Sequence, residues 1–593
     1  MTLILGLNAF HADSSAALIR DGNIIAAVEE ERFKRVKHYA GFPVKSITWC
    51  LEEAGISLGE IDHLAINTLP SANRFRRYAY TILNLPSPLF LLDKIKNKRE
   101  RTNIKKLIEK YFGKEAFKGE LHFIEHHLSH MASAFYPSDF KDAAVVSIDG
   151  FGDFASCAVG QGNDTDLIAY QRIFFPHSLG VFYTSITQFL GFPNYGDEYK
   201  VMGLAPYGEP CFLEEMKDIV KLNHDGTFKL NLKYFRHSNQ RLAHQWSHGA
   251  PFVDRHYSEK LCNLLGSPRK KEEELTDQHK NIAASAQRMY EIAFFNFLNA
   301  AYLKVKEDKV CLAGGCAANS VANGKITRFT NFKEVFVQAA AGDAGGALGS
   351  ALMVWHKLYN QRSKPMNSAS LGCSNKLDDI DKILLNSSAR LKDKNIKLIS
   401  YSLGDNQLKD ENEFLQFIVD EILEGSVIGW FQGRMEWGPR ALGNRSILCD
   451  PRRIDMKDIL NKKIKFRESF RPFAPSVLQE HVKDWFILES ELDVNVPFMM
   501  KVYPLKTLKR KLVPAVCHVD GTARLQTVNE KNNGIYYRLI QKFYESTNVP
   551  MLVNTSFNEN EPIVRTLEEA YDCFIRTKMD LLVVDNMIIK KSL

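Results

Sequence analysis

The sequence contains no CxxC pair, although it has 10 cysteines among its 593 residues. The cysteines are scattered, and several stand inside apolar runs, as Cys311 does in "KVCLAGGCAANS". This usage is typical of thiols that pack as small apolar groups in a reducing compartment. It argues against a disulfide-stabilised scaffold and against a zinc ribbon.

The chain also lacks any apolar run long enough to span a bilayer. Its first residues, "MTLILGLNAFHADSSA", include no basic region of the kind that opens a secretory signal peptide. We therefore expect a cytoplasmic protein with no membrane partner.

Several well-known site motifs are missing as well. There is no GxxxxGK[ST] phosphate loop and no GxSxG nucleophile turn. The stretch "GFGDFA" (150–155) resembles a GxGxxG/A dinucleotide motif, but β-rich sequence and another glycine turn follow it where a helix should begin. These absences argue against a P-loop NTPase, an α/β-hydrolase and a dinucleotide-binding fold.

Charge of either sign is not concentrated enough to indicate nucleic-acid binding. The formal net charge is +7, from 77 Lys and Arg against 70 Asp and Glu, and the small excess is spread along the chain. The densest basic run, "KIKNKRERTNIKK" (94–106), lacks interleaved aromatic residues, so we interpret it as a solvated helix face. We expect small anionic ligands, and we do not expect nucleic acid as a partner.

Two stretches of the sequence repeat one pattern. At the N-terminus "LILGLN", "AALIRDG" and "NIIAAVEE" predict three strands, with a polar turn after the first and an Asp-Gly hairpin turn after the second. Between residues 143 and 174, "AAVVSID", "ASCAVGQG" and "LIAYQRIFF" repeat this order, roughly 140 residues later. The duplication predicts two related α/β lobes with a cleft between them, as in actin-like, sugar-kinase and Hsp70 ATPases.

Two glycine-rich turns support this prediction. "VCLAGGCAANSVANGKI" (310–326) and "VFVQAAAGDAGGALGSAL" (335–352) each pass from a β-rich stretch through glycine into a helix-like stretch. Such junctions can present backbone N–H groups to phosphates, although glycine also serves helix packing alone. Residues 357–395 are rich in Ser, Asn, Pro and Gly, which indicates a boundary before a second domain.

The stretch "EHHLSH" (125–130) raises the question of a metal site. In a helix, His126 and His130 lie at positions i and i+4 on one face, while His127 is rotated about 100° away. This spacing fits a pair of metal ligands, and it fits a hydrogen-bonded histidine pair equally well. Asp149 ends a predicted strand and Asp343 stands in a glycine turn, and a His₂Asp₂ set suits iron, manganese or zinc.

Arginines characterise the C-terminal part of the chain. Many of them stand beside glycine or proline, where helical ion pairs are not available, in "WFQGRMEWGPRALGNRSILCDPRR", "KKIKFRESFRPFAP" and "HVDGTARLQTV". Guanidinium groups match phosphate oxygens in a bidentate fashion, so these loops favour a phosphate pocket. Surface arginines in weak ion pairs remain the alternative for part of the set.

A set of ordered motifs resembles a known family. The motifs include "GLNAFHADSSAAL", "EEERFKRVKHYAGFP", "EHHLSH", "SIDGFGD", "DEYKVMGLAPYG", "GGCAANS", "AAAGDAGGALG", "EWGPRALGNRSIL", "FRPFAPSVL", "HVDGTAR" and "VNTSFN". Together they are similar to those of the O-carbamoyltransferases of the NodU/CmcH/TobZ family, and they cover almost the whole chain.

The resemblance implies a fold and an activity. Residues 1–360 would form an actin-like (ASKHA) two-lobed domain, as in tRNA threonylcarbamoyladenosine synthesis, residues 361–394 a linker, and residues 395–593 a YrdC-like α/β domain. The YrdC-like domain would convert carbamoyl phosphate and ATP, with Mg²⁺, into carbamoyl-adenylate and release pyrophosphate. An iron-type site (iron, or manganese or zinc) in the first domain would help to transfer the carbamoyl group to a hydroxyl of a small natural product or saccharide.

The resemblance also implies roles for particular residues. The catalytic metal ligands would be His126, His130, Asp149 and Asp343. The nucleotide site would be lined by His11, Gly150, Gly314, Gly315 and Asn319. Carbamoyl phosphate and the ATP phosphates would be bound by Lys465, Arg471, Arg524, Asn554 and Ser556.

Several questions stay open at this point. A tRNA-modifying carbamoyl or threonylcarbamoyl transferase is the alternative enzyme, and a nucleotide-binding chaperone or regulator is an alternative of another class. The acceptor hydroxyl needs a base, for which His127 and Glu125 are candidates by proximity only. Residues 68–118 and 209–280 resemble no shared motif and would shape the acceptor pocket or contacts within a homo-oligomer.

Overall fold

The structure is a computed structural model that describes residues 1–84, 103–238, 240, 242, 244–245, 249–374, 396–400 and 411–591. The chain divides into two compact units, Met1–Met366 and Asn367–Leu593. The predicted linker 361–394 and the basic run 94–106 fall partly outside the described residues. Each unit is considered by itself below.

The first sheet of the N-terminal unit contains five strands within the described residues, and the opening residues predict the first three of them in chain order. In order of position across the sheet these are β3 (Asn23–Glu29), β2 (Ser15–Arg20), β1 (Leu3–Asn8), β4 (His63–Ile66) and β5 (Glu120–Phe123). β1, β2 and β3 are antiparallel neighbours, while β1, β4 and β5 are parallel. Asp21 and Gly22 both have positive φ, 48° and 73°, as a two-residue hairpin turn with the right twist requires.

The second sheet repeats this topology. Its strands, in sheet order, are β8 (Asp166–Phe174), β7 (Ala155–Asn163), β6 (Asp142–Gly152), β13 (Lys309–Ala313) and β14 (Glu334–Val337). β6, β7 and β8 are antiparallel neighbours, and β6, β13 and β14 are parallel. Strand order and direction therefore agree in the two sheets, and the predicted duplication is confirmed.

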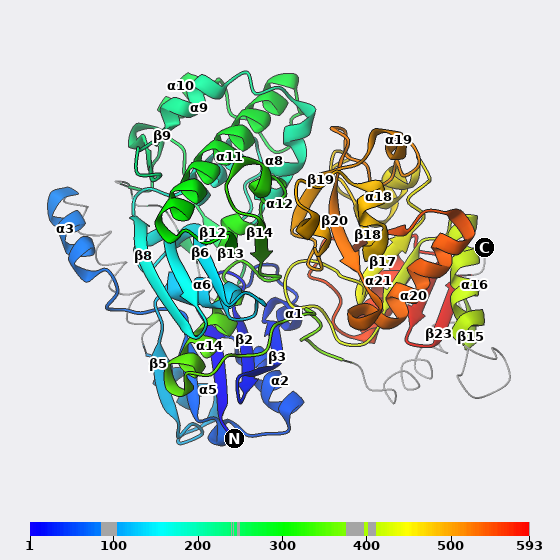
Figure 1. The fold of residues 1–593 in the computed structure, drawn as a ribbon, viewed down its shortest axis with the longest axis horizontal. Helices are drawn as coiled ribbons and strands as arrows, with labels where there is room; N and C mark the ends of the chain where they lie inside the picture. Colours follow the sequence, from blue (N-terminus) through cyan, green and yellow to red (C-terminus); the bar gives the residue numbers. More distant parts are fainter. Residues whose placement is uncertain are drawn as a thin grey trace. The chain divides into compact units, whose positions relative to one another are not determined.

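Two helices lie between the sheets. α14 (Gly345–Tyr359) packs on β1, β2 and β4, whereas α6 (His126–Phe135) packs on β6, β7 and β13, and the two helices contact each other (Figure 1). The helices can approach this closely because small residues line the contact: a Cβ on Gly349 would lie 1.8 Å from the Ser129 carbonyl oxygen. Gly6 of β1 faces the carbonyl of Ala347 in the same way, at 1.9 Å.

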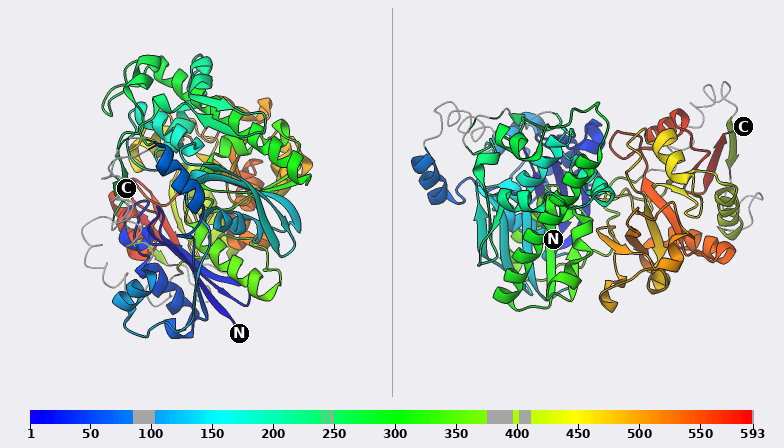
Figure 2. Two further views of the ribbon diagram at one scale, coloured as in Figure 1. Left: turned by 90° about the vertical axis from the view of Figure 1, so that its left-hand side faces the viewer. Right: turned by 90° about the horizontal axis from the view of Figure 1, so that it is seen from above.

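Other helices cover the outer faces of the two sheets. α2 (Val44–Ala54) packs on β2 and β3, while α7 (Leu179–Phe189) and the long α11 (Asp277–Val305) pack on β6 (Figure 2). The remaining elements of this unit are α1 (Glu31–Lys34), α3 (Arg74–Asn84), α5 (Ile104–Phe112), α8 (Glu198–Leu204), α9 (Leu213–Ile219), β9 (Val220–Leu222), β10 (Phe228–Leu230), β11 (His244–Gln245), β12 (Phe252–Val253), α10 (Glu259–Leu265), α12 (Ser320–Asn323) and α13 (Ile326–Phe329).

The C-terminal unit is built on one mixed sheet, which has nine strands within the described ranges. In sheet order they are β15 (Ile396–Ser400), β23 (Met587–Lys591), β22 (Leu581–Val584), β16 (Ile428–Phe431), β17 (Arg445–Cys449), β21 (Met551–Ser556), β18 (Ala474–Leu478), β20 (Thr522–Val528) and β19 (Lys501–Pro504). The helices are α16 (Glu411–Glu424), α17 (Met456–Asp458), α18 (Val482–Trp485), α19 (Thr507–Arg510), α20 (Glu530–Thr547) and α21 (Leu567–Arg576). α20 packs on β18, β20 and β21, and α21 packs on β16 and β22, so the apolar core lies between helices and sheet.

The predicted fold class is therefore confirmed: a two-lobed α/β domain of the actin-like kind precedes the α/β domain expected to be YrdC-like. Among the described helices, none combines the length and the apolar character needed to cross a membrane. In the first unit, the candidate site lies where strand ends meet α6 and α14.

Candidate metal centre and arginine cluster

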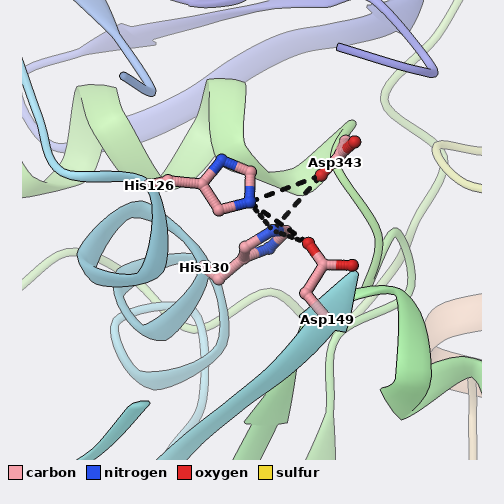
Figure 3. A group of neighbouring side chains, drawn as sticks. All are labelled: His126, His130, Asp149 and Asp343. Carbon is pink, nitrogen blue, oxygen red and sulfur yellow. Dashed lines mark hydrogen bonds and ion pairs between the residues drawn. The ribbon is translucent and has the colours of Figure 1, made fainter. Parts of the chain in front are cut away.

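Four side chains converge at the junction of the two lobes (Figure 3). His126 Nε2 and His130 Nε2 lie 3.1 Å apart, and each lies 3.1 Å from Asp149 Oδ2. Asp343 Oδ1 lies 3.6 Å from His126 Nε2 and 3.4 Å from His130 Nε2. The structure thus brings together the four residues predicted as metal ligands, and we call them the metal centre.

Local structure explains why these side chains meet. His126 and His130 stand one turn apart on α6, which begins at His126. Asp149 lies on β6, against which α6 packs, and Asp343 lies in the turn just before α14. Because α6 and α14 contact each other, the turn before α14 reaches the first turns of α6 (Figure 3).

Burial and charge shift the proton affinities at the metal centre. Burial by itself lowers the pKa of His130, but the carboxylates of Asp149 and Asp343 outweigh it and raise this pKa to about 9. Burial raises the pKa of Asp149, yet its bonds to the two histidines hold it well below the usual range. Burial and the charge of Asp149 raise the pKa of Asp343. Two half-buried carboxylates therefore face the same pair of imidazoles, which favours a cation between them.

The donor set fits a bound metal ion. Bonds of about 2.0–2.2 Å from an ion to nitrogen and oxygen separate neighbouring ligand atoms by roughly 3.0–3.6 Å. The observed separations of 3.1 to 3.6 Å fall in that range. The Nε2 atoms of the two histidines face each other and the same Asp149 oxygen, so protons cannot fill all three gaps between these atoms. A single cation at the centre would accept a lone pair from each of the three atoms.

Glycine backbone groups orient Asp149 from its other side. Its Oδ1 atom accepts hydrogen bonds from the N–H of Gly150, at 2.7 Å, and of Gly315, at 3.1 Å. Gly314 has φ 92°, and a Cβ there would lie 2.2 Å from the Ile148 carbonyl oxygen, so only glycine fits. Three residues predicted to line a nucleotide site thus surround a metal-centre carboxylate.

The other two residues predicted for the nucleotide site lie differently. The ring of His11 lies beside that of His126, with ring centroids 4.9 Å apart. Asn319 instead caps α12 through the Ala322 N–H and exchanges two hydrogen bonds with Gln287, at 3.0 and 3.2 Å. Its side chain supports the turn after β13, and its predicted contact with a nucleotide stays a prediction.

One residue at the site, Asp153, was not among the predicted site residues. Its Oδ2 atom accepts hydrogen bonds from the N–H of His126, at 3.0 Å, and of Leu69, at 2.8 Å, and its Oδ1 atom accepts one from the Thr68 hydroxyl. Asp153 therefore fixes the start of α6, where the first histidine ligand stands. Its place in the quoted motif "SIDGFGD" was the available signal, but a turn aspartate is usually a turn former.

The two residues considered as a base for the acceptor are held in structural contacts. Glu125 caps α6 through the Leu128 N–H, at 2.9 Å, and lies 3.3 Å from Arg172. His127 is turned away from the metal centre and shares a hydrogen bond with Ser147, at 2.9 Å. Burial lowers the pKa of His127 to about 4, so the ring is neutral and enclosed.

In the C-terminal unit, Lys465 lies among residues of the predicted phosphate site. It is buried, and its ammonium donates to the side-chain and main-chain oxygens of Asn558, both at 2.7 Å, and to the carbonyl of Ser556. Lys465 and Ser556 are thus brought together as predicted, and Asn558 joins them.

Four half-buried arginines form what we call the arginine cluster: Arg440, Arg467, Arg471 and Arg524. Burial, followed by the charges of the other three, holds the pKa of Arg524 well below its usual range. Among the described residues, the Arg524 Nε has no hydrogen-bond partner. Like charges at this density are stabilised by an anion, and phosphate matches guanidinium geometry.

Asn554 and Arg445 make contacts inside this unit, and the predicted contact of Asn554 with carbamoyl phosphate or the ATP phosphates stays a prediction. Asn554 donates to Ser476 and Gln526, both at 2.9 Å, and so joins β21 to β18 and β20 inside the core. Arg445 is buried, donates to main-chain carbonyls and lies over the Phe431 ring at 3.6 Å. Arginine content alone could not distinguish Arg445 from Arg524.

Comparison with known proteins identifies the family of the chain that carries these two clusters. A model described as "Carbamoyltransferase N-terminus" matches residues 3–352, and one described as "Carbamoyltransferase C-terminus" matches residues 419–591. The chain belongs to the carbamoyltransferase family. It is a carbamoyltransferase enzyme, and the metal centre and arginine cluster lie in its N-terminal and C-terminal parts, respectively.

Relatives of this carbamoyltransferase include two that match nearly its whole length. An uncharacterized protein of Synechocystis, sll1178, is 41% identical over 100% of this chain and 97% of its own length. The nodulation protein NolNO of Sinorhizobium fredii is 38% identical over 98% of this chain and 80% of its own length.

Solved structures resemble parts of the carbamoyltransferase at low sequence identity. HypF of T. kodakarensis matches 60% of this chain and 48% of its own, with a TM-score of 0.31 and 13% identity. Component A of (R)-2-hydroxyglutaryl-CoA dehydratase from Acidaminococcus fermentans matches 60% of this chain and 99% of its own, with a TM-score of 0.32 and 14% identity.

Proposed function

We propose that the enzyme is an ATP-dependent O-carbamoyltransferase that uses carbamoyl phosphate. The observation that carries this proposal is that one carbamoyltransferase chain contains both a His₂Asp₂ cluster with metal-ligand spacing and a cluster of four arginines. Carbamoyl phosphate has a resonance-stabilised carbonyl, and a mixed anhydride with AMP provides a better leaving group.

The arginine cluster is the proposed site of activation. Water releases phosphate from carbamoyl phosphate, and an oxygen of the resulting carbamate attacks the α-phosphorus of ATP, which releases pyrophosphate and leaves carbamoyl-adenylate. In each of these steps, phosphate oxygens next to the reacting bond carry negative charge. Arg471 and Arg524, with Arg440 and Arg467, supply fixed positive charge there, and Lys465 and Ser556 lie in the same unit.

The metal centre is the proposed site of transfer. His126, His130, Asp149 and Asp343 would hold iron, or manganese or zinc, which when bound supplies Lewis-acid polarisation of a carbonyl. The Gly150 and Gly315 N–H groups hold the Asp149 carboxylate in place, and Asp153 holds the start of α6. We expect His11, whose ring lies beside that of His126, to contact the nucleotide part of the intermediate.

The acceptor we propose is a hydroxyl of a small natural product or saccharide. Nodulation proteins are among the relatives, and they are similar to this chain over most of its length. The basic run 94–106 lacks interleaved aromatic residues and lies mostly outside the described residues. ATP with Mg²⁺ and carbamoyl phosphate complete the set of small-molecule partners in the cytoplasm.

The experiment measures release of pyrophosphate from ATP by the purified enzyme with and without carbamoyl phosphate. We expect release only when carbamoyl phosphate is present. Incubation with labelled carbamoyl phosphate and a panel of hydroxylated metabolites then identifies the acceptor. Pyrophosphate release independent of carbamoyl phosphate would refute the activation step, and labelling of tRNA in place of the metabolites would support the tRNA-modifying alternative.

A further inference from the structure

A second cluster of metal-ligating side chains lies on the edge of the first sheet, away from the four residues of the metal centre. His63 Nδ1 and His122 Nε2 are 3.0 Å apart. The Glu120 Oε2 atom lies 3.7 Å from each of these nitrogens. The two histidine side chains are 16% and 18% exposed, whereas the Glu120 carboxylate is 67% exposed, so the triangle opens to solvent.

Strand register places these three side chains on one face. His63 on β4 is directly paired with Glu120 on the parallel strand β5. His122 follows Glu120 by two residues, and side chains alternate along a strand, so all three project to the same side of the sheet. The backbone therefore fixes the convergence, which does not depend on long flexible side chains.

Hydrogen bonding accounts for only part of this geometry. One neutral imidazole can donate to the other across 3.0 Å, which satisfies the two nitrogens that face each other. Glu120 is too far from both rings, at 3.7 Å, to accept a hydrogen bond from either. The sides of the triangle, 3.0, 3.7 and 3.7 Å, do, however, come within about 0.1 Å of the roughly 3.0–3.6 Å that separates ligand atoms around a transition-metal ion.

We propose that His63, Glu120 and His122 form a second metal site, which binds a divalent transition-metal ion of the zinc class. Two imidazoles and one carboxylate occupy one face of the ion, and water completes the coordination on the open side. The ion joins β5, the edge strand of this sheet, to β4. β5 continues within three residues into α6, which carries the metal centre, so the second ion steadies the segment that leads to it.

The test uses the full-length protein with the metal centre removed by His126→Ala and His130→Ala. Titration with Zn²⁺ by calorimetry, or with Co²⁺ by its visible absorption, should show one bound ion in this background. Adding His63→Ala and His122→Ala should weaken binding at least about 100-fold, and Glu120→Gln should weaken it about 10-fold. Zn²⁺ should also raise the melting temperature of the background protein, and this rise should disappear in the His63→Ala, His122→Ala variant.

Two controls keep the test decisive. His224 is an exposed histidine of the same unit, and His224→Ala should leave binding unchanged. In the protein with an intact metal centre, the stoichiometry should fall from two ions to one when His63 and His122 are both replaced. Binding that survives this replacement, or a background protein that binds no ion while its circular dichroism is unchanged, would overturn the proposal.

Discussion

The metal centre and the arginine cluster solve opposite electrostatic problems. The first places two half-buried carboxylates beside two buried imidazoles. The N–H groups of Gly150 and Gly315 donate to Asp149, and the Asp153 carboxylate accepts from the His126 N–H, so the site is fixed at the ends of regular elements. The second gathers four half-buried guanidinium groups, one on strand β20 and three on loops. We propose that a cation completes the first site and an anion the second. The difference teaches that one cluster offers imidazole and carboxylate ligands while the other offers guanidinium groups, so the two clusters suit ligands of opposite charge.

The largest expected effect tests the anion side of this comparison. Arg524→Ala removes the guanidinium that burial and three neighbouring arginines perturb most. We expect carbamoyl-phosphate-dependent pyrophosphate release to fall about 10²–10³-fold, because a fixed donor to phosphate charge is lost. The matched control is Arg453→Ala, since Arg453 pairs with Asp455 at the surface of the same unit. Equal loss in both variants would contradict a specific role for the cluster.

The next effect tests how the cation site is held. Asp153→Asn keeps the size of the side chain but removes the negative charge of the carboxylate, which accepts hydrogen bonds from the His126 and Leu69 N–H groups. We expect metal affinity to fall about 10–100-fold, as is typical when the support of a ligand is altered, with pyrophosphate release unchanged. Asp164→Asn, in an exposed hairpin, serves as the control. Unchanged metal affinity in Asp153→Asn would show that α6 is positioned without it.

The smallest expected effect is on the pH dependence of stability in the first unit, through His38. Burial lowers the pKa of His38, but Asp13, 2.9 Å away, and Glu31 raise it overall to about 9. Because the folded pKa lies above the ordinary value, the stabilisation is complete below about pH 6.5 and is lost as the pH rises through about 9. Urea unfolding should therefore show that His38→Gln destabilises the protein at about pH 6 more than at about pH 9.5. A difference that grows with pH would contradict this assignment.

Much of the fold was predictable because its signals are local. The strands around "LILGLN" and "AAVVSID" are continuous apolar runs bounded by turn residues, and the Asp21–Gly22 turn has a specific backbone requirement. Repetition of the same order of strands then predicted two related lobes that share a three-strand unit, although β4 and β5 were not predicted. The i, i+4 spacing of His126 and His130 was equally local.

The rest of the site depends on contacts between distant segments. Spacing could not decide between a metal pair and a hydrogen-bonded pair, whereas the approach of Asp149 and Asp343 depends on how α14 packs on α6. Arg445 and Arg524 look alike in sequence, yet one is enclosed by carbonyl groups and the other faces three arginines. His63 and Glu120 are 57 positions apart and meet only through strand register.

The most direct test of the account measures both half-reactions in His130→Ala. This variant removes one ligand of the metal centre and leaves the arginine cluster intact. We predict that it releases pyrophosphate at the wild-type rate but fails to transfer the labelled carbamoyl group to the acceptor, while its metal content falls. Loss of pyrophosphate release with unchanged metal content would contradict the division of labour between the two sites.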